Sequence, residues 1–192
     1  MNRLSTLPLL ASVAALLAPA AAIAAPATAW AVDKAASRVG FASSFSGTGF
    51  TGTFRRWDAT IRFDSKNLAG SSVTASLDTG SAATGSPDRD QALPTDTFFA
   101  ATRFPKATFT ANSFRDLGGG RYQAMGTLTI RGVAKPLTLP FTLAITGGQA
   151  HMTAAVAVNR LAFGVGQGEW KATEAIPAAV TVSIDLTARR AP

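Results

Sequence analysis

Apolar and polar residues alternate through most of the chain after residue 38. In the clearest stretch, residues 122–145, one parity is apolar from Tyr122 to Ile130. The order breaks at residues 132–136, and the alternation resumes at Leu137. Side chains of a strand point alternately to opposite faces, so this stretch predicts two half-buried strands joined by a tight connection.

The same period-2 pattern recurs in seven other segments, namely residues 39–45, 50–54, 57–63, 73–77, 107–111, 152–158 and 180–188. Phe54 and Trp57 fall on opposite parities. Both can point inward only if an extra residue lies between them, which predicts a β-bulge or sharp bend at Arg55-Arg56. The glycines of residues 118–120 and 147–148 separate neighbouring segments and predict hairpins.

Two segments lack this alternation. Ser86 followed by Pro87 is typical of a helix N-cap and first helical position, so a short helix is predicted to begin there. Pro94 should end it, and Thr95-Asp96 should cap a second helical turn that runs through Phe99 to Thr102. Residues 159–177 form a long, Gly-rich connection with Trp170 in the middle.

Each predicted strand has one apolar face, while its other face is rich in Thr, Ser and charge. Because no second apolar stripe needs another layer to cover it, the pattern favours an all-β fold, a closed antiparallel barrel of about eight strands with a short helical insert. Small inward residues such as Ala59, Ala75 and Ala124 leave room for a cavity. The alternative is a barrel filled by Phe and Trp side chains.

The N-terminus carries the features of a secretory signal peptide. Arg3 precedes an apolar segment, and Ala22-Ile23-Ala24 is a small-x-small cleavage site. We therefore expect residues 1–24 to be a signal peptide and residues 25–192 to be a single exported domain. A membrane anchor is disfavoured because the apolar segment is short and is interrupted by Pro8 and Pro19.

Composition narrows the function further. The net charge is +7, but the basic residues are scattered and form no tract with interleaved aromatics, so nucleic-acid binding is not predicted. The charge would favour anionic lipid surfaces or head groups.

Residues able to do chemistry are scarce. With no cysteine and a single histidine, His151, a zinc site built from His and Cys is excluded, and we expect His151 to be an exposed turn residue. No G-x-S-x-G motif accompanies it, which argues against a catalytic triad. Residues 164–168 are Gly-rich but lack the Lys-Ser/Thr of a P-loop.

Charged residues of the helical insert leave two alternatives open. Asp88 and Asp90 could act as a carboxylate pair, although they also stabilise a helix N-terminus. Arg89 could form a surface ion pair with Asp90. Alternatively, the insert and Phe98-Phe99 cap the barrel, and Arg89 fixes this lid or meets an anionic head group.

Several short motifs, in order, resemble the YceI-like family of exported, lipocalin-like proteins. They are Trp30-Ala31-Val32-Asp33, Ser37 to Phe41, Gly52-Thr53-Phe54, Ile61 to Asp64, Arg89-Asp90 with Leu93, Phe98-Phe99, Phe104-Pro105 with Phe109, Gly126 to Val133 with Lys135-Pro136, and Arg160 with Phe163-Gly164. The match covers nearly all of the predicted mature chain. Residues 166–170 are similar to the corresponding loop in the periplasmic members of this family.

The resemblance implies an antiparallel lipocalin-like barrel with a helical insert that holds a polyisoprenoid chain. It also implies a non-catalytic carrier of an isoprenoid lipid or quinone, with no other cofactor. A membrane surface or a cytochrome b-type membrane protein would be a partner, and a homodimer is conceivable. Many members carry a His where this chain has Phe45, so a polar contact near the mouth is in doubt.

In this interpretation a set of mostly aromatic residues binds the ligand. The pore-lining residues are Phe41, Phe45, Phe63, Phe109, Leu128, Phe141 and Ile184, and Phe98, Phe99, Trp170 and Arg89 lie at one end. Two other functions stay open: a structural or stress-response envelope protein with a filled barrel, and an enzyme that acts on a prenyl lipid through Asp88, Asp90 or Arg89.

Overall fold

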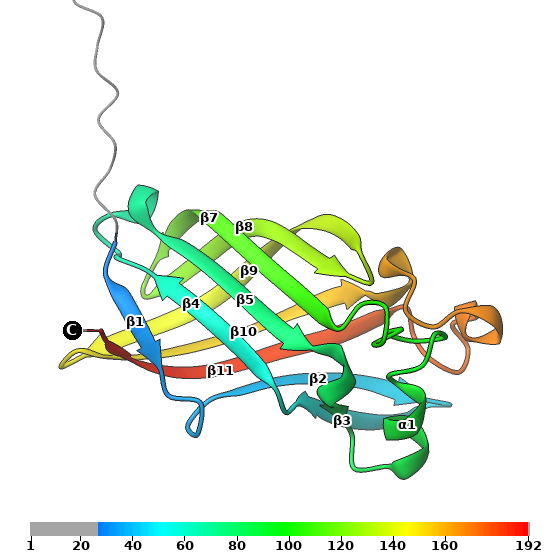
Figure 1. The fold of residues 1–192 in the computed structure, drawn as a ribbon. Helices are drawn as coiled ribbons and strands as arrows, with labels where there is room; N and C mark the ends of the chain where they lie inside the picture. The colour runs from blue at the N-terminus through cyan, green and yellow to red at the C-terminus, as the bar shows by residue number, and fades with distance from the viewer. Residues whose placement is uncertain (1–26, 192) are drawn as a thin grey trace, which may run out of the picture.

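The computed structural model describes residues 27–191, so the predicted signal peptide, residues 1–24, lies outside the described residues. The described chain forms eleven strands and one α-helix (Figure 1). The strands are β1 (Ala29–Val32), β2 (Arg38–Phe45), β3 (Thr48–Phe54), β4 (Trp57–Arg62), β5 (Ser72–Asp78), β6 (Ala82–Ala83), β7 (Lys106–Gly118), β8 (Arg121–Ile130), β9 (Val133–Thr146), β10 (Gln149–Asn159) and β11 (Ala179–Arg190). The helix is α1 (Pro87–Ala92), and the 3-10 turns are η1 (Leu68–Gly70), η2 (Thr79–Ser81), η3 (Arg160–Phe163) and η4 (Gly168–Lys171).

Eight strands close into an antiparallel barrel. Their order is β1-β4-β5-β7-β8-β9-β10-β11, and β1 pairs with β11 to complete the circle. The predicted fold class, an eight-stranded closed barrel with a short helix, is therefore confirmed. The hairpins predicted at residues 118–120 and 147–148 connect β7 to β8 and β9 to β10.

Three neighbouring strands of the barrel are each broken in two. Strand β2 continues β1, β4 continues β3, and β6 follows β5 after η2. The bend predicted at Arg55-Arg56 is confirmed, because β3 ends at Phe54 and β4 begins at Trp57. The Ser81 carbonyl oxygen accepts a hydrogen bond from the Arg55 amide, and the Ser81 hydroxyl oxygen accepts one from the Arg56 amide. Strands β2, β3 and β6 thus form a rim panel beside the closed part of the barrel, attached to β11 through β2.

Helix α1 begins as predicted, with Ser86 at the N-cap and Pro87 in the first turn. The second helical turn predicted through Phe99 to Thr102 is wrong, because residues 93–103 form turns rather than a helix. Ala100 has φ of 49°, in the left-handed region, which stops a right-handed helix. None of the helices in residues 27–191 has the length and apolarity needed to cross a membrane.

Aromatic side chains fill one end of the barrel. The Phe63 ring lies 5.3–5.9 Å from the rings of Tyr122, Phe114 and Phe141, and we call these four residues the closed-end cluster. Edge-to-face rings at such distances gain energy beyond their buried area. Trp30 borders the cluster and donates an indole hydrogen bond of 2.9 Å to the Phe63 carbonyl oxygen.

Candidate functional site: an apolar cavity inside the barrel

A cavity of about 610 Å³ lies inside the barrel. Along β11 it is lined by alternate residues, namely Val180, Val182, Ile184, Leu186 and Ala188. At a rise of roughly 3.3 Å per residue, this wall extends about 26 Å along the strand. The volume falls in the range of about 300–1,000 Å³ that is typical of small-molecule sites, and the lining follows β11 along most of its length.

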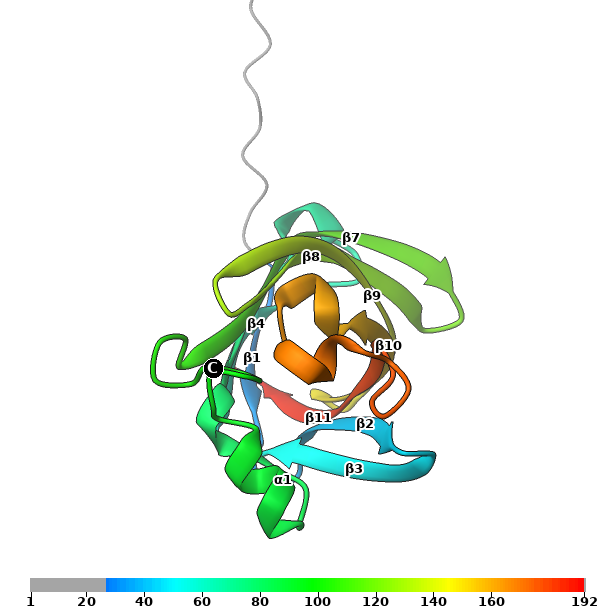
Figure 2. The same ribbon diagram turned by 90° about the vertical axis from the view of Figure 1, so that its right-hand side faces the viewer.

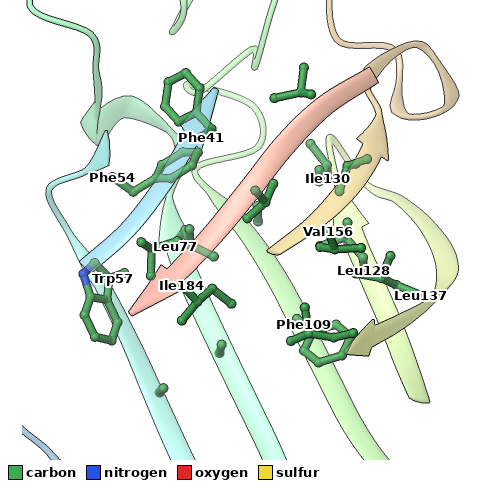
Figure 3. Close-up of a pocket in the computed structure, with 18 of the residues that line it drawn as sticks. Phe41, Phe54, Trp57, Leu77, Phe109, Leu128, Ile130, Leu137, Val156 and Ile184 are labelled. Carbon is green, nitrogen blue, oxygen red and sulfur yellow. The ribbon is translucent and has the colours of Figure 1, made fainter. Parts of the chain in front are cut away.

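The cavity wall is mostly apolar because the inward-facing residues of the strands are mostly apolar. Figure 3 shows Phe109, Leu128 and Ile184 projecting inward from three different strands. Predicted small inward residues also line it, among them Ala59, Ala75 and Ala124, and they leave space that larger side chains would fill. Polar side chains gather where α1 meets the cavity: Thr84, Ser86, Asp88 and Arg89.

All the residues predicted to bind a ligand line this one cavity: Phe41, Phe45, Phe63, Arg89, Phe98, Phe99, Phe109, Leu128, Phe141, Trp170 and Ile184. The alternation along each strand fixed which side chains point inward, and barrel closure brings them together. Phe63 and Phe141 belong to the closed-end cluster, so they form the floor of the cavity rather than its middle. That these residues contact a ligand stays a prediction.

The opposite end, which we call the mouth, carries two chains of aromatic rings. Trp170 lies 6.0 Å from Phe45 and 6.0 Å from Phe98 between ring centroids. Phe54 lies 5.4 Å from Phe41 and 5.9 Å from Phe99. These rings come from the rim panel, from η4 and from the turns after α1, so the mouth is built largely outside the closed barrel strands.

The connection between β10 and β11, with η3 and η4, lies across the open end of the barrel (Figure 2). It is organised around Arg160, whose buried guanidinium donates to the carbonyl oxygens of Val165, Ala172, Ile176 and Pro177. Burial lowers the pKa of Arg160, and the four carbonyl partners offset part of the desolvation cost. Gly166 is required beside it, because an added Cβ would lie 2.1 Å from Arg160 Nη1 and φ is +82°.

A second arginine ties the turns after α1 to the barrel. Arg131, in the β8–β9 turn, donates from Nη1 to the Asp96 carbonyl oxygen at 2.7 Å and also to the Phe98 carbonyl oxygen. Between them, the Thr97 carbonyl oxygen accepts hydrogen bonds of 2.9 Å from the amides of Gly166 and Gln167. The two segments that cover the mouth are therefore bonded to each other.

The structure of the helical insert decides between the two alternatives for Arg89, a surface ion pair with Asp90 or a place at the lid of the barrel. No ion pair within residues 27–191 joins Arg89 to Asp90. The Arg89 guanidinium lies 4.7 Å from the Phe50 ring centroid, and its Nε donates to the Thr84 hydroxyl oxygen at 3.3 Å. Asp90 accepts hydrogen bonds from the Thr84 hydroxyl and amide, which hold the pKa of Asp90 below its ordinary value. Arg89 thus borders the cavity, as the lid alternative requires.

The remaining candidate groups do not form a site. His151 lies in β10 rather than in a turn, and its Nε2 is 2.8 Å from an Asp185 carboxylate oxygen on the exposed outer face. Within residues 27–191, no group of three or more His, Cys, Asp or Glu residues is placed to hold a metal ion.

Sequence reasoning assigned no role to three residues of this region. Arg131 and Arg160 stood in the quoted motifs, but the carbonyl groups they bind are set by loop conformation. Ser43 lies on the otherwise apolar parity of the alternating segment at residues 39–45, and it lines the cavity.

Comparisons with known proteins agree with this architecture. The family model described as "YceI-like domain" matches residues 30–188. Over 88 residues the chain is 40% identical to Protein YceI of Shigella flexneri, a match that covers 46% of this chain and 46% of the relative. The chain therefore matches about half the length of such curated relatives.

Two solved structures have the same fold. BcnA of Burkholderia cenocepacia superposes with a TM-score of 0.79 at 31% identity, over 81% of this chain and 98% of BcnA. A polyisoprenoid binding domain from Saccharophagus degradans, implicated in plant cell wall breakdown, gives a TM-score of 0.67 over 85% of this chain and 99% of that domain. At 18% identity the second likeness shows the fold alone.

Proposed function

The chain belongs to the YceI-like domain family, and from this premise we propose that it binds a long isoprenoid lipid or isoprenoid quinone in its barrel cavity. In this proposal the protein is a non-catalytic carrier that works in the periplasm. The observation that carries it is the long apolar cavity, which fits an extended hydrocarbon chain better than a compact ligand. The polyisoprenoid binding of the Saccharophagus degradans domain supports the ligand class.

Burial of a prenyl chain supplies enough free energy without any catalytic residue. Each buried methylene contributes about 0.8 kcal/mol. Micromolar affinity requires about 8 kcal/mol, so several buried prenyl units suffice after ordering costs. The alternative of a filled barrel is disfavoured by the cavity of about 610 Å³.

Export through a signal peptide at residues 1–24, the single domain at residues 25–192, a membrane or cytochrome b-type partner, and a homodimer remain predictions from the sequence. Catalysis by Asp88, Asp90 or Arg89 finds no support in the cavity, since Asp90 is engaged by Thr84 and Arg89 by Thr84 and Phe50.

Native mass spectrometry and organic extraction of the purified protein test the proposal. We expect an isoprenoid lipid to co-purify or to be taken up on incubation. Ala75 lines the cavity, so Ala75→Phe should obstruct it and abolish uptake. Thr74→Phe, on the opposite face of β5, is the matched control and should bind normally. Absence of lipid from the wild type under both conditions would overturn the proposal.

A further inference from the structure

Ser43 carries a buried hydroxyl oxygen that has no hydrogen-bond partner, and it is the one such side-chain atom within residues 27–191. It lies on the inward parity of β2 between Phe41 and Phe45, and it lines the cavity. A buried polar group without a partner costs about 1–3 kcal/mol, so native proteins rarely keep one without a reason.

The surroundings of Ser43 explain why this hydroxyl has no protein partner. Across β3 it faces Phe50, and the β2–β11 register continued by one residue places it opposite Val180. With Phe41 and Phe45 on either side along β2, its neighbours are apolar. A buried water needs two to four polar partners, and this wall offers few, so water alone is a poor partner for the hydroxyl.

One charged group lies nearby. Arg89 stacks over Phe50, the residue directly opposite Ser43, with the guanidinium 4.7 Å from the ring centroid. Only its Nε is engaged, by the Thr84 hydroxyl oxygen, so Nη1 and Nη2 have no partner among the described residues. Ser43 and Arg89 therefore both carry hydrogen-bond donors next to Phe50, near the mouth of a mostly apolar cavity.

We propose that Ser43 and Arg89 form a polar subsite that receives a hydrogen-bond acceptor on the head of the bound lipid, of the kind that a quinone carbonyl oxygen provides. This inference rests on the proposed function. The head lies beside Phe50 near the mouth, and the tail extends toward the closed-end cluster. The subsite selects isoprenoids with an acceptor head over isoprenoid hydrocarbons, because a hydrocarbon leaves the donors unpaired. The subsite would also supply a polar contact from β2, the strand in which this chain has Phe45 where many family members have a His.

The test compares two probes presented from detergent micelles: a prenylated benzoquinone, and squalene, a linear isoprenoid hydrocarbon without a polar head. Ser43→Ala should weaken quinone binding about fivefold, the loss expected for one hydrogen bond, and leave squalene binding unchanged. The ligand-free variant should be as stable as the wild type or more stable, because it loses an unpaired buried hydroxyl. Ser44→Ala, on the opposite face of β2, is the matched control and should change neither affinity.

Arg89→Gln should also weaken quinone binding more than squalene binding. Equal affinities of Ser43→Ala and wild type for the quinone, or an equal loss for both probes, would overturn the subsite and leave lipid binding intact. If the wild type binds neither probe, the proposed function itself fails. Circular dichroism of each variant separates these outcomes from a loss of fold.

Discussion

The two ends of the barrel are both rich in aromatic rings, but they hold these rings in different ways. The closed-end cluster stands on or directly beside paired strands, and Trp30 bonds the Phe63 carbonyl. At the mouth, Trp170 and Phe98 stand on turns held by a few bonds from Arg131, Arg160 and the Thr97 carbonyl. Similar rings thus stand on paired strands at one end and on bonded turns at the other, and the proposed loading of a long chain would take place through the turns.

Removal of the Phe63 ring, at the centre of the closed-end cluster, should have the largest effect on stability. Phe63 is 6% exposed and contacts three other rings, so Phe63→Ala should lower the free energy of unfolding by about 3–5 kcal/mol. Urea unfolding measures this loss. Phe45→Ala, at the 42% exposed rim position, is the control and should cost less than about 1 kcal/mol. Equal losses at the two sites would remove the contrast between the ends.

Loss of the Arg160 guanidinium should affect the mouth alone. Arg160→Met leaves four carbonyl groups without their donor and should cost about 2–4 kcal/mol. Hydrogen exchange should accelerate in residues 161–177, while β8 and β9 around the floor keep their protection. Uniform acceleration in all strands would show that Arg160 stabilises the whole barrel rather than its cover.

Truncation of Trp170 at the mouth should change the rate of ligand dissociation more than the stability of the fold. Trp170 contacts Phe45 and Phe98 but is partly exposed, so Trp170→Ala should cost less than about 1 kcal/mol. A bound isoprenoid should nevertheless dissociate several-fold faster, because the two segments lose a shared contact over the opening. Stopped-flow transfer of lipid to empty vesicles measures this rate, and an unchanged rate would argue for exit elsewhere.

The smallest effect concerns Asp90 beside the mouth. Hydrogen bonds from Thr84 hold its pKa below the unfolded value of about 3.9, so this contact stabilises the fold above that pH and is lost as the pH falls through the folded pKa. Thr84→Val should move the Asp90 carboxyl titration, followed by NMR, toward the ordinary value. Thr95→Val, on the turns of the same insert, should leave it in place.

The strands were predictable from sequence to the extent that they are long. Alternation identified nine of the eleven, and the parity conflict between Phe54 and Trp57 located the bend. Strands β1 and β6 were missed because four and two residues are too short to show a period. The extent of β7 to Gly118 was also missed, because a register shift between Ala111 and Ser113 interrupts its parity.

The sequence predicted which residues line the cavity, but not how those at the mouth contact one another. Inward parity places Phe109, Leu128 and Ile184 on the cavity whatever the barrel's details. By contrast, the contact of Trp170 with Phe45 and Phe98 joins three segments through loop conformation, which no local pattern encodes. Ser43 gave a readable signal, a small polar residue within an apolar parity, but its lack of a partner appears only in three dimensions.

The breaks in three adjacent strands separate closure of the barrel from the shape of its opening. The barrel closes through β1, which pairs with β11 and β4. The rim panel is attached to β11 through β2, by the pairs from Thr181–Ala42 to Asp185–Arg38. We therefore expect insertions or substitutions at the breaks to reshape the opening while the pairing of β1 with β11 and β4 keeps its register. For the proposed lipid-binding function, this predicts that the shape of the opening can change without loss of barrel closure.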